Sequence, residues 1–323
     1  MAPRRARVWC RLAAVALALA PPAHRAAEGG SESGADARWS TDAERAALCD
    51  GAAHPYPPHS RRPVRWVHVP KTGTSFMNTV WHYACSLPPT ASASDFSAMY
   101  EKHFAQRFPP AEHCARLMLD HSPATHKPIG DGEWAAHAGA FVTMLRAPST
   151  RLVSAFKHGR HCIQDCSPEM RNAPPCTAVR DARRLNKCRA LRRATGLREY
   201  AEQPAALGCA ARMLVGRACN EPLALRANES RAAAARLGSV GFGFVGLVEE
   251  WNLSVCLFHR LLGGTPRPQE FSAVRVNKQT TIIFRRHPDL ARALRDPADE
   301  LLYAVATRRF RRQVRAVLAK FAR

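Results

Sequence analysis

Three short apolar segments, each followed directly by residues at helical spacing, limit the folds open to this chain. They are residues 66–69, 141–146 and 242–250. Strands that alternate with helices along a chain favour a mostly parallel sheet with helices on both faces. We therefore predict the α/β class, with ligands bound where the carboxyl ends of strands meet helix N-termini.

The turn after the first segment carries residue types that suit an anion. In "WVHVPKTGTSF" the turn 71–75 leads into a helical pattern that starts at Phe76. Such a turn aims backbone N–H groups and the positive end of a helix dipole at one spot. Lys71 adds charge, and Gly73 lets the backbone approach a ligand closely. Further donors are the hydroxyl groups of Thr72, Thr74 and Ser75. The alternative is a capped helix after a strand, which is the commoner meaning of "TGTS" alone.

The chain is strongly basic. Its 323 residues carry a formal net charge of +22 and are long enough for one sizeable core or two small domains. A field of this sign favours acidic partners, such as acidic polysaccharide, anionic lipid or a multiply phosphorylated nucleotide. No zinc-finger spacing, aromatic RNA-binding strand or basic region with heptads accompanies the charge, so we do not expect a nucleic-acid partner.

The N-terminus has the pattern of a targeting segment. A basic head, "MAPRRAR", precedes the apolar run "LAAVALALA". Nine helical residues cover about 13 Å, against roughly 30 Å of membrane hydrocarbon. We predict a signal peptide or short signal anchor at 1–25, through which the protein associates with a membrane if it is not cleaved. A flexible stem at 26–62 and a catalytic domain at 63–323 are expected to follow.

The cysteine content agrees with a secretory route. Of eleven cysteines, Cys10 lies in the targeting segment, and an even number remains for disulfides. A polar, cysteine-rich insertion is expected at about 159–219. Its dense cysteines, which match no common zinc spacing, are Cys162, Cys166, Cys176 and Cys188. Two sequons begin at Asn228 and Asn252, which are acceptors for glycosylation in that compartment.

A second anion site is predicted after the second segment. Arg146 ends that segment and Ser154 lies inside the following helix, so a guanidinium fork and a hydroxyl are available for a terminal phosphate. Here "PKTGTSF" resembles the 5′-phosphosulfate loop of sulfotransferases. "LRAPSTRLVSAF" resembles their 3′-phosphate motif, usually written R-D-P-x-x-R-x-x-S. "FVGLVEEWNLSVCLFHRLLGG" is similar to a segment of Golgi carbohydrate sulfotransferases, among them the heparan sulfate 2-O and galactose 3-O types.

The resemblance, over residues 65–315, implies a P-loop NTPase-like sulfotransferase fold and a donor, 3′-phosphoadenosine 5′-phosphosulfate (PAPS). It implies that Lys71 and the loop from Thr72 to Phe76 bind the 5′-phosphosulfate and stabilise the departing phosphate. Arg146 and Ser154 would hold the 3′-phosphate and orient the donor. No metal is expected. The implied acceptor is a glycan, either an acidic polysaccharide or part of a glycoprotein or glycolipid, in the Golgi lumen.

The general base is the least constrained assignment. Family members of the 2-O type carry a histidine base before the arginine motif, and His121 lies at a similar distance. Alternatives are His126 and the carboxylates of Glu101 and Glu133. The motif's usual aspartate is Ala147 here, so its role is missing or is supplied from elsewhere.

Other residues are open to two interpretations. Glu249 and Glu250 either contact the acceptor or stabilise a helix start. Asn277 and Lys278 either join the nucleotide site or form a solvated turn. The arginines near the C-terminus, which either bind a polyanion or form a solvated helix face, are Arg308, Arg309, Arg311, Arg312 and Arg315. Rival functions are acidic-glycan binding without turnover, a nucleotide or small-molecule kinase, and protein-tyrosine sulfation. The ATP-binding pattern G-x-x-x-x-G-K-[ST] is absent, which counts against a kinase.

Overall fold

A computed structural model of the chain describes seven stretches: 41–57, 62–84, 117–119, 126–158, 196–221, 223–271 and 288–322. Several predictions lie outside these residues. They concern the targeting segment, most of the cysteine-rich insertion, Glu101, His121, Asn277 and Lys278.

A parallel three-stranded sheet organises the domain, in the order β1-β2-β3. The strands are β1 (Arg65–Val67), β2 (Phe141–Leu145) and β3 (Phe242–Leu247). In register, Trp66 lies beside Val142, and Val142 lies beside Phe244. The three predicted apolar segments therefore supply these strands, and the α/β class is confirmed. A parallel bridge from Val64 to Met118 continues the pairing beyond β1.

A helix follows each strand, as the sequence predicts. The 3₁₀ turn η1 (Thr74–Phe76) and α2 (Met77–Ala84) follow β1, and α6 (Pro148–His158) follows β2. After β3 come η5 (Val248–Glu250) and α12 (Trp251–Leu262). Helix α12 ends at two glycines, Gly263 and Gly264, which have φ of 92° and 76°.

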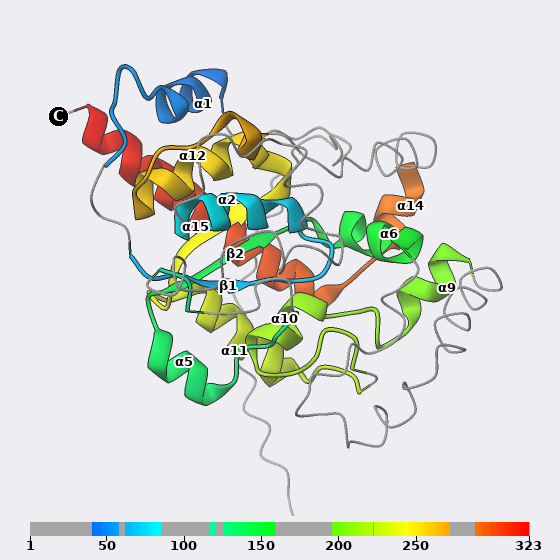
Figure 1. Ribbon diagram of the computed structural model, residues 1–323. Coiled ribbons are helices and arrows are strands. Elements are labelled where there is room, and N and C mark those ends of the chain that lie inside the picture. Colours follow the sequence, from blue (N-terminus) through cyan, green and yellow to red (C-terminus); the bar gives the residue numbers. More distant parts are fainter. Residues whose placement is uncertain are drawn as a thin grey trace, which may run out of the picture. The chain divides into compact units, whose positions relative to one another are not determined.

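The other helices surround this unit. They are α1 (Asp42–Cys49), α5 (Asp131–His137), α9 (Leu197–Glu202), α10 (Cys209–Leu214), α11 (Ala227–Gly238), η6 (Pro268–Phe271), α14 (Pro288–Ala293) and α15 (Pro297–Phe321). Figure 1 shows α2 and α12 on one side of the sheet and α10 and α11 on the other. The sheet is thus covered on both faces, which agrees with the burial of all three strands.

The C-terminal helix α15 protects the edge of the sheet. The Gln313 carboxamide lies beside β3, where it donates to the Gly243 carbonyl at 3.1 Å and accepts from the Val245 N–H at 3.4 Å. These bonds occupy backbone groups that an edge strand would otherwise expose. On α15 the Phe310 ring is buried in the core, whereas Leu301 is 40% exposed.

The predicted flexible stem is wrong for residues 41–57. Helix α1 is joined to α12 by a disulfide between Cys49 and Cys256. The Arg260 guanidinium donates to the carbonyl groups of Leu48, Asp50, His54 and Pro55. It also lies 3.8 Å from the centre of the Tyr56 ring. This part of the chain therefore belongs to the folded domain.

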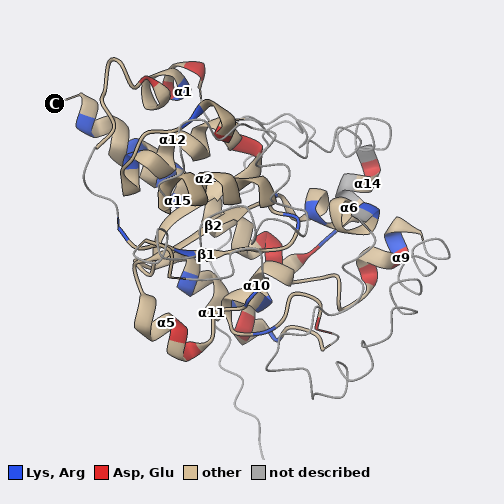
Figure 2. Cartoon of the chain, in the orientation of Figure 1, with Lys and Arg blue, Asp and Glu red and all other residues tan. Residues whose placement is uncertain are grey.

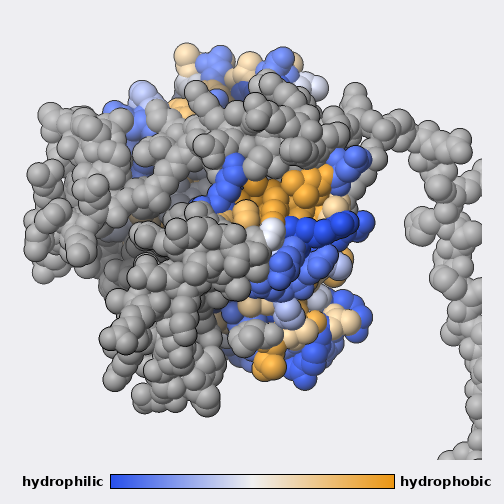
Figure 3. All heavy atoms as spheres, turned by 90° about the vertical axis from the view of Figure 1, so that its right-hand side faces the viewer, coloured by the Kyte–Doolittle hydropathy of each residue, from blue (hydrophilic) through white to orange (hydrophobic). Residues whose placement is uncertain are grey.

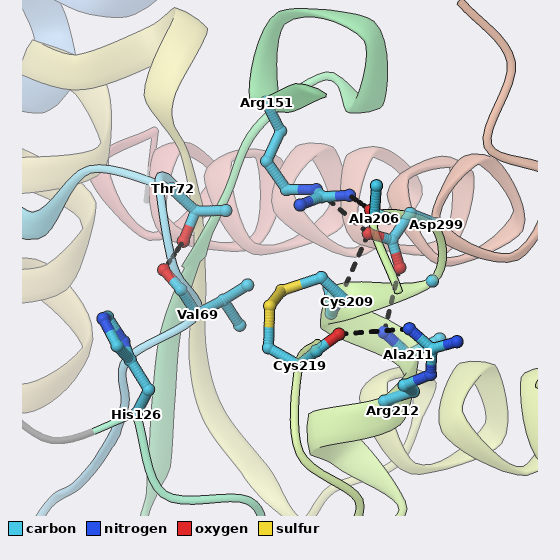
Figure 4. Close-up of a disulfide and its surroundings, with 12 residues drawn as sticks. Val69, Thr72, His126, Arg151, Ala206, Cys209, Ala211, Arg212, Cys219 and Asp299 are labelled. Carbon is cyan, nitrogen blue, oxygen red and sulfur yellow. Dashed lines mark hydrogen bonds and ion pairs between the residues drawn. A yellow bond between two sulfur atoms is a disulfide. The ribbon is translucent and has the colours of Figure 1, made fainter. Parts of the chain in front are cut away.

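The predicted insertion also ends earlier than expected. Helix α10 contributes buried residues to the main core, and a disulfide joins Cys209 to Cys219. Arg212 on α10 is almost fully buried and donates to the carbonyl of Cys219 at 3.1 Å (Figure 4). The cysteines in the described stretches therefore all form disulfides. The other cysteines of the chain lie outside those stretches.

A second apolar cluster joins α6 to α9 and α14, through buried residues that include Leu152, Tyr200 and Leu294. On this side of the molecule, Figure 3 shows apolar surface between hydrophilic residues. Figure 2 shows basic and acidic residues interspersed over the described elements. None of the helices in the described stretches has the length and apolar character that a membrane crossing requires.

Candidate functional site

The two predicted anion-binding segments lie at the same edge of the sheet. The turn 71–75 follows the carboxyl end of β1, and Arg146 follows the carboxyl end of the adjacent parallel strand β2. A Cβ atom built on Gly73 would lie 3.9 Å from the Met144 side chain and 3.0 Å from that of Val248. The turn therefore lies over the ends of β2 and β3, next to the Arg146 segment.

The turn has a backbone that glycine makes possible. Gly73 has φ of 82°, and an added Cβ would also lie 3.0 Å from the Trp251 ring. Lys71 is the one non-glycine residue of the described stretches with positive φ, at 68°. The Phe76 N–H makes the first 3₁₀ bond, to the Gly73 carbonyl at 2.8 Å. The N–H groups of Thr74 and Ser75 precede that bond, so the helix provides no acceptor for them.

The predicted loop residues divide into two groups. The Thr72 hydroxyl is buried and donates to the Val69 carbonyl at 2.8 Å, so its proton stabilises the turn (Figure 4). The Phe76 ring is fully buried and stacks on Phe244 at a centroid distance of 5.5 Å. Within the described stretches, no hydrogen bond engages the hydroxyl groups of Thr74 and Ser75. Those two hydroxyl groups, with the backbone N–H groups of Thr74 and Ser75, are donors that the turn can offer an anion.

Arg146 is held by one end of its guanidinium. Nε donates to the Thr150 hydroxyl at 2.9 Å, and that hydroxyl donates to the Ala147 carbonyl at 2.8 Å. Burial lowers the pKa of Arg146 from its usual value, and the charge of Glu249 opposes that shift. Among the described residues neither Nη1 nor Nη2 makes a hydrogen bond. The side that bonds an anion in a fork geometry is therefore available.

Ser154 lies two turns into α6 and retains 4% of its exposed surface. No hydrogen bond within the described part of the chain engages its hydroxyl. The predicted role beside Arg146 thus has its donor available, although burial restricts the directions from which a ligand can reach it.

Glu249 is a residue of this edge whose partners the sequence does not reveal. It follows β3, and one carboxylate oxygen accepts from the Ala147 N–H at 2.9 Å. The other oxygen accepts from the Tyr303 hydroxyl of α15 at 3.0 Å. The carboxylate thus lies at the start of α6, where it stabilises the positive end of the helix dipole. Of the two interpretations from the sequence, the helix-start role is the one that the geometry supports.

The second arginine of the motif, Arg151, is enclosed rather than accessible. Its guanidinium lies 3.1 Å from the Asp296 carboxylate and 3.3 Å from that of Asp299, and it donates to the Ala206 carbonyl at 2.7 Å (Figure 4). All three charged side chains are buried. Burial, together with the charge of Asp296, raises the pKa of Asp299 to about 6. This cluster joins α6 to α10 and α15.

Of the two proposed bases in the described stretches, His126 and Glu133, the structure places His126 at this edge. Its Nδ1 lies 2.9 Å from the His68 carbonyl, just after β1, and the two imidazole rings are 4.3 Å apart. A carbonyl only accepts, so Nδ1 carries a proton. Glu133 instead bonds Arg65 at 2.6 Å, at the amino end of β1. That position is the opposite edge, which argues against Glu133 as the base.

A buried carboxylate links three elements next to this region. Glu270 of η6 lies 3.0 Å from His82 Nδ1 on α2 and 2.7 Å from His259 Nε2 on α12. His259 Nδ1 faces the Gly263 carbonyl at 3.2 Å, so both of its nitrogens face acceptors. Burial acts to raise the pKa of Glu270, but the hydrogen bonds from His259 and His82 outweigh it, and the pKa is lowered. The arrangement is an internal hydrogen-bonded cluster that joins three elements.

Among the residues that the structure describes, no group of three histidine, cysteine, aspartate or glutamate side chains has a metal-binding arrangement. Comparisons with protein families, with curated proteins and with solved structures find no match to this chain. The site is therefore interpreted from its own residues. Its chemistry is that of a cationic edge with directed N–H, hydroxyl and guanidinium donors.

Proposed function

We propose that the protein is a PAPS-dependent sulfotransferase that acts on a hydroxyl group of a glycan. One observation carries the proposal: two cationic segments, 71–76 and 146–154, lie at the same edge of a parallel sheet and keep donors for anions. A nucleotide with phosphate groups at two positions of its ribose needs two such segments. The proposal includes a P-loop NTPase-like sulfotransferase fold and residence in the lumen of the secretory pathway, in the Golgi.

In this proposal the turn after β1 binds the 5′-phosphosulfate. The acceptor oxygen attacks sulfur in line, the bond from sulfur to the bridging phosphate oxygen breaks, and the phosphate leaves with the added charge. Lys71 and the N–H groups of Thr74 and Ser75 stabilise that charge. Arg146 and Ser154 hold the 3′-phosphate, which orients the donor without taking part in the chemistry. Thr72, Gly73 and Phe76 contribute by fixing the shape of the turn.

A base must take the proton of the acceptor hydroxyl. The resemblance favours His121, and His126 is the alternative, with its Nδ1 bonded to the His68 carbonyl just after β1. We expect His121→Ala to reduce turnover at least tenfold while affinity for PAPS is preserved. His126→Ala is the parallel variant. Unchanged turnover in one of them removes that residue as the base, and unchanged turnover in both removes an imidazole base altogether.

The decisive test is transfer of radiolabelled sulfate from PAPS to a panel of glycans, with the linkage of the product determined. Lys71→Ala should abolish transfer while thermal unfolding stays cooperative. Lys320→Ala, at the exposed end of α15, is the matched control and should retain activity. Full activity of Lys71→Ala would reject the proposed role of the turn. Sulfation of peptide tyrosine in place of glycan would assign the acceptor to protein.

A second candidate is an acidic-glycan-binding protein that uses the same fold without turnover. Ala147 favours it, because the motif of active enzymes usually has aspartate there. Such a protein would bind sulfated glycan but transfer no label. Thermal shifts with PAPS, adenosine 3′,5′-bisphosphate and ATP also test the kinase alternative. Only the first two ligands offer a 3′-phosphate to Arg146, so a larger shift with ATP would favour a kinase.

A further inference from the structure

We infer that Glu249 is a positioning residue of the donor site, because from the end of β3 its carboxylate accepts from the backbone N–H of Ala147, next to Arg146. The inference rests on the proposed function, because it concerns how Arg146 is held for the 3′-phosphate. It assigns no contact between Glu249 and the donor.

The two oxygens of Glu249 bond to two separate elements. One accepts from the Ala147 N–H at 2.9 Å, and the other accepts from the Tyr303 hydroxyl at 3.0 Å. Ala147 immediately precedes α6, and its carbonyl accepts the first helical bond, from the Arg151 N–H at 2.9 Å. Ala147 is therefore the N-cap of α6, at a position where an aspartate side chain would normally cap the helix. The carboxylate of Glu249 reaches this N-cap from another strand.

Glu249 holds the backbone next to Arg146 without occupying its guanidinium. Arg146 Nε is bonded to Thr150, and no ion pair joins Arg146 to Glu249 among the described residues. The carboxylate fixes the turn in which Arg146 sits, while Nη1 and Nη2 stay available. If Glu249 paired directly with Arg146, it would compete with an incoming phosphate for the same donors.

The arrangement has two opposing effects on an anion. The charge of Glu249 repels a phosphate at Arg146, whereas its hydrogen bonds hold Arg146 in the orientation that a phosphate needs. Removing Glu249 strengthens anion binding if repulsion dominates, and weakens it if positioning dominates. The sign of the change therefore separates the two roles.

The experiment measures binding of adenosine 3′,5′-bisphosphate and of adenosine 5′-monophosphate by calorimetry. For Glu249→Ala we expect affinity for the bisphosphate to fall about tenfold, because the two hydrogen bonds that hold the turn next to Arg146 are lost. Affinity for the monophosphate should be unchanged, since it has no 3′-phosphate. If Glu249→Ala only made the fold less stable, affinity would fall for both nucleotides or for neither. Tighter binding of the bisphosphate would overturn the inference in favour of simple repulsion.

Three further variants sharpen the result. Glu249→Gln keeps an acceptor for the Ala147 N–H, so we expect a loss of about threefold or less. Tyr303→Phe removes one of the two bonds and should fall between wild type and Glu249→Ala. Glu202→Gln removes a carboxylate that is 71% exposed on α9, and it should behave as wild type. A loss in Glu202→Gln equal to that in Glu249→Ala would mean that net charge, not position, is measured.

The comparison of the two ligands also tests the donor site itself. If wild-type protein does not prefer the bisphosphate to the monophosphate, the proposed donor site itself is rejected, and the inference falls with it.

Discussion

Arg146 and Arg151 belong to the same short motif, yet their surroundings differ in every respect that decides what an arginine does. Arg146 lies at the carboxyl edge of the sheet, bonded through Nε alone, with its fork available. Arg151 is buried between the carboxylates of Asp296 and Asp299 and bonds the Ala206 carbonyl. A motif written as a string of letters gives both arginines equal weight. In the structure Arg151 is enclosed between two carboxylates, whereas the Nη1 and Nη2 atoms of Arg146 make no hydrogen bond among the described residues.

The difference follows from the direction in which each side chain leaves the chain. Arg146 follows β2 before the helix begins, so it projects from the edge where strands end. Arg151 lies in the first turns of α6, on the side that packs against α15. There its charge is balanced by two carboxylates, one of which takes up protons near neutral pH. Removing one partner of such a buried cluster leaves an uncompensated charge, whereas an arginine with an open fork can bond an anion.

Removing Arg151 tests the structural side of this comparison and has the largest expected effect. Arg151→Ala leaves Asp296 and Asp299 buried without their cation, which should lower the free energy of unfolding by about 3–5 kcal/mol. Urea denaturation followed by circular dichroism measures the loss. A variant that is as stable as wild type but fails to bind adenosine 3′,5′-bisphosphate would contradict the structural role of Arg151.

Removing Arg146 should give the opposite pattern. Arg146→Ala removes a charged hydrogen-bond donor from the 3′-phosphate, so we expect affinity for adenosine 3′,5′-bisphosphate to fall roughly tenfold to hundredfold. The free energy of unfolding should change by less than about 1 kcal/mol, because few protein groups depend on this side chain. Calorimetry gives the first quantity and urea denaturation the second. A large loss of stability without a loss of affinity would contradict the assignment.

The Arg151 cluster should also make stability depend on pH. The pKa of Asp299 is raised to about 6 in the folded protein, above its value in the unfolded chain. The folded state therefore binds a proton more tightly, and the stability contributed by this group rises as pH falls from 7 towards 5. We expect a gain of about 1 kcal/mol over that range. Asp299→Asn should lack this gain in denaturation curves, and a wild type with no gain between pH 7 and pH 5 would remove the effect.

The smallest effect concerns how Arg146 is held. Thr150→Val keeps the shape of the side chain but removes the hydroxyl that accepts from Nε and donates to the Ala147 carbonyl. We expect affinity for adenosine 3′,5′-bisphosphate to fall about threefold, with little change in stability. Ser149→Ala, on the same turn, is the control. Equal losses in both variants would mean that the turn as a whole, not the Thr150 hydroxyl, is responsible.

The strands and the helices that follow them were predictable because periodicity is a local property. The three apolar segments predicted the strands β1, β2 and β3. Contacts between distant segments carry no such local signal. The bond between Glu249 and Ala147, 102 residues apart in the chain, depends on the pairing of β2 with β3. The pairing of Arg151 with Asp296 depends on the packing of α15. For the same reason the sequence described Thr72 as a ligand donor, whereas its hydroxyl proton bonds the adjacent turn.

The disulfide between Cys49 and Cys256 limits where a truncated form of the protein can begin. A truncated chain beginning at Pro63, the boundary that composition suggests, would expose the Cys256 thiol and deprive Arg260 of its carbonyl partners. An unpaired thiol in an oxidising compartment is open to wrong pairing and to covalent dimers. Recombinant protein for any of the assays above should therefore begin before Thr41, the N-cap of α1.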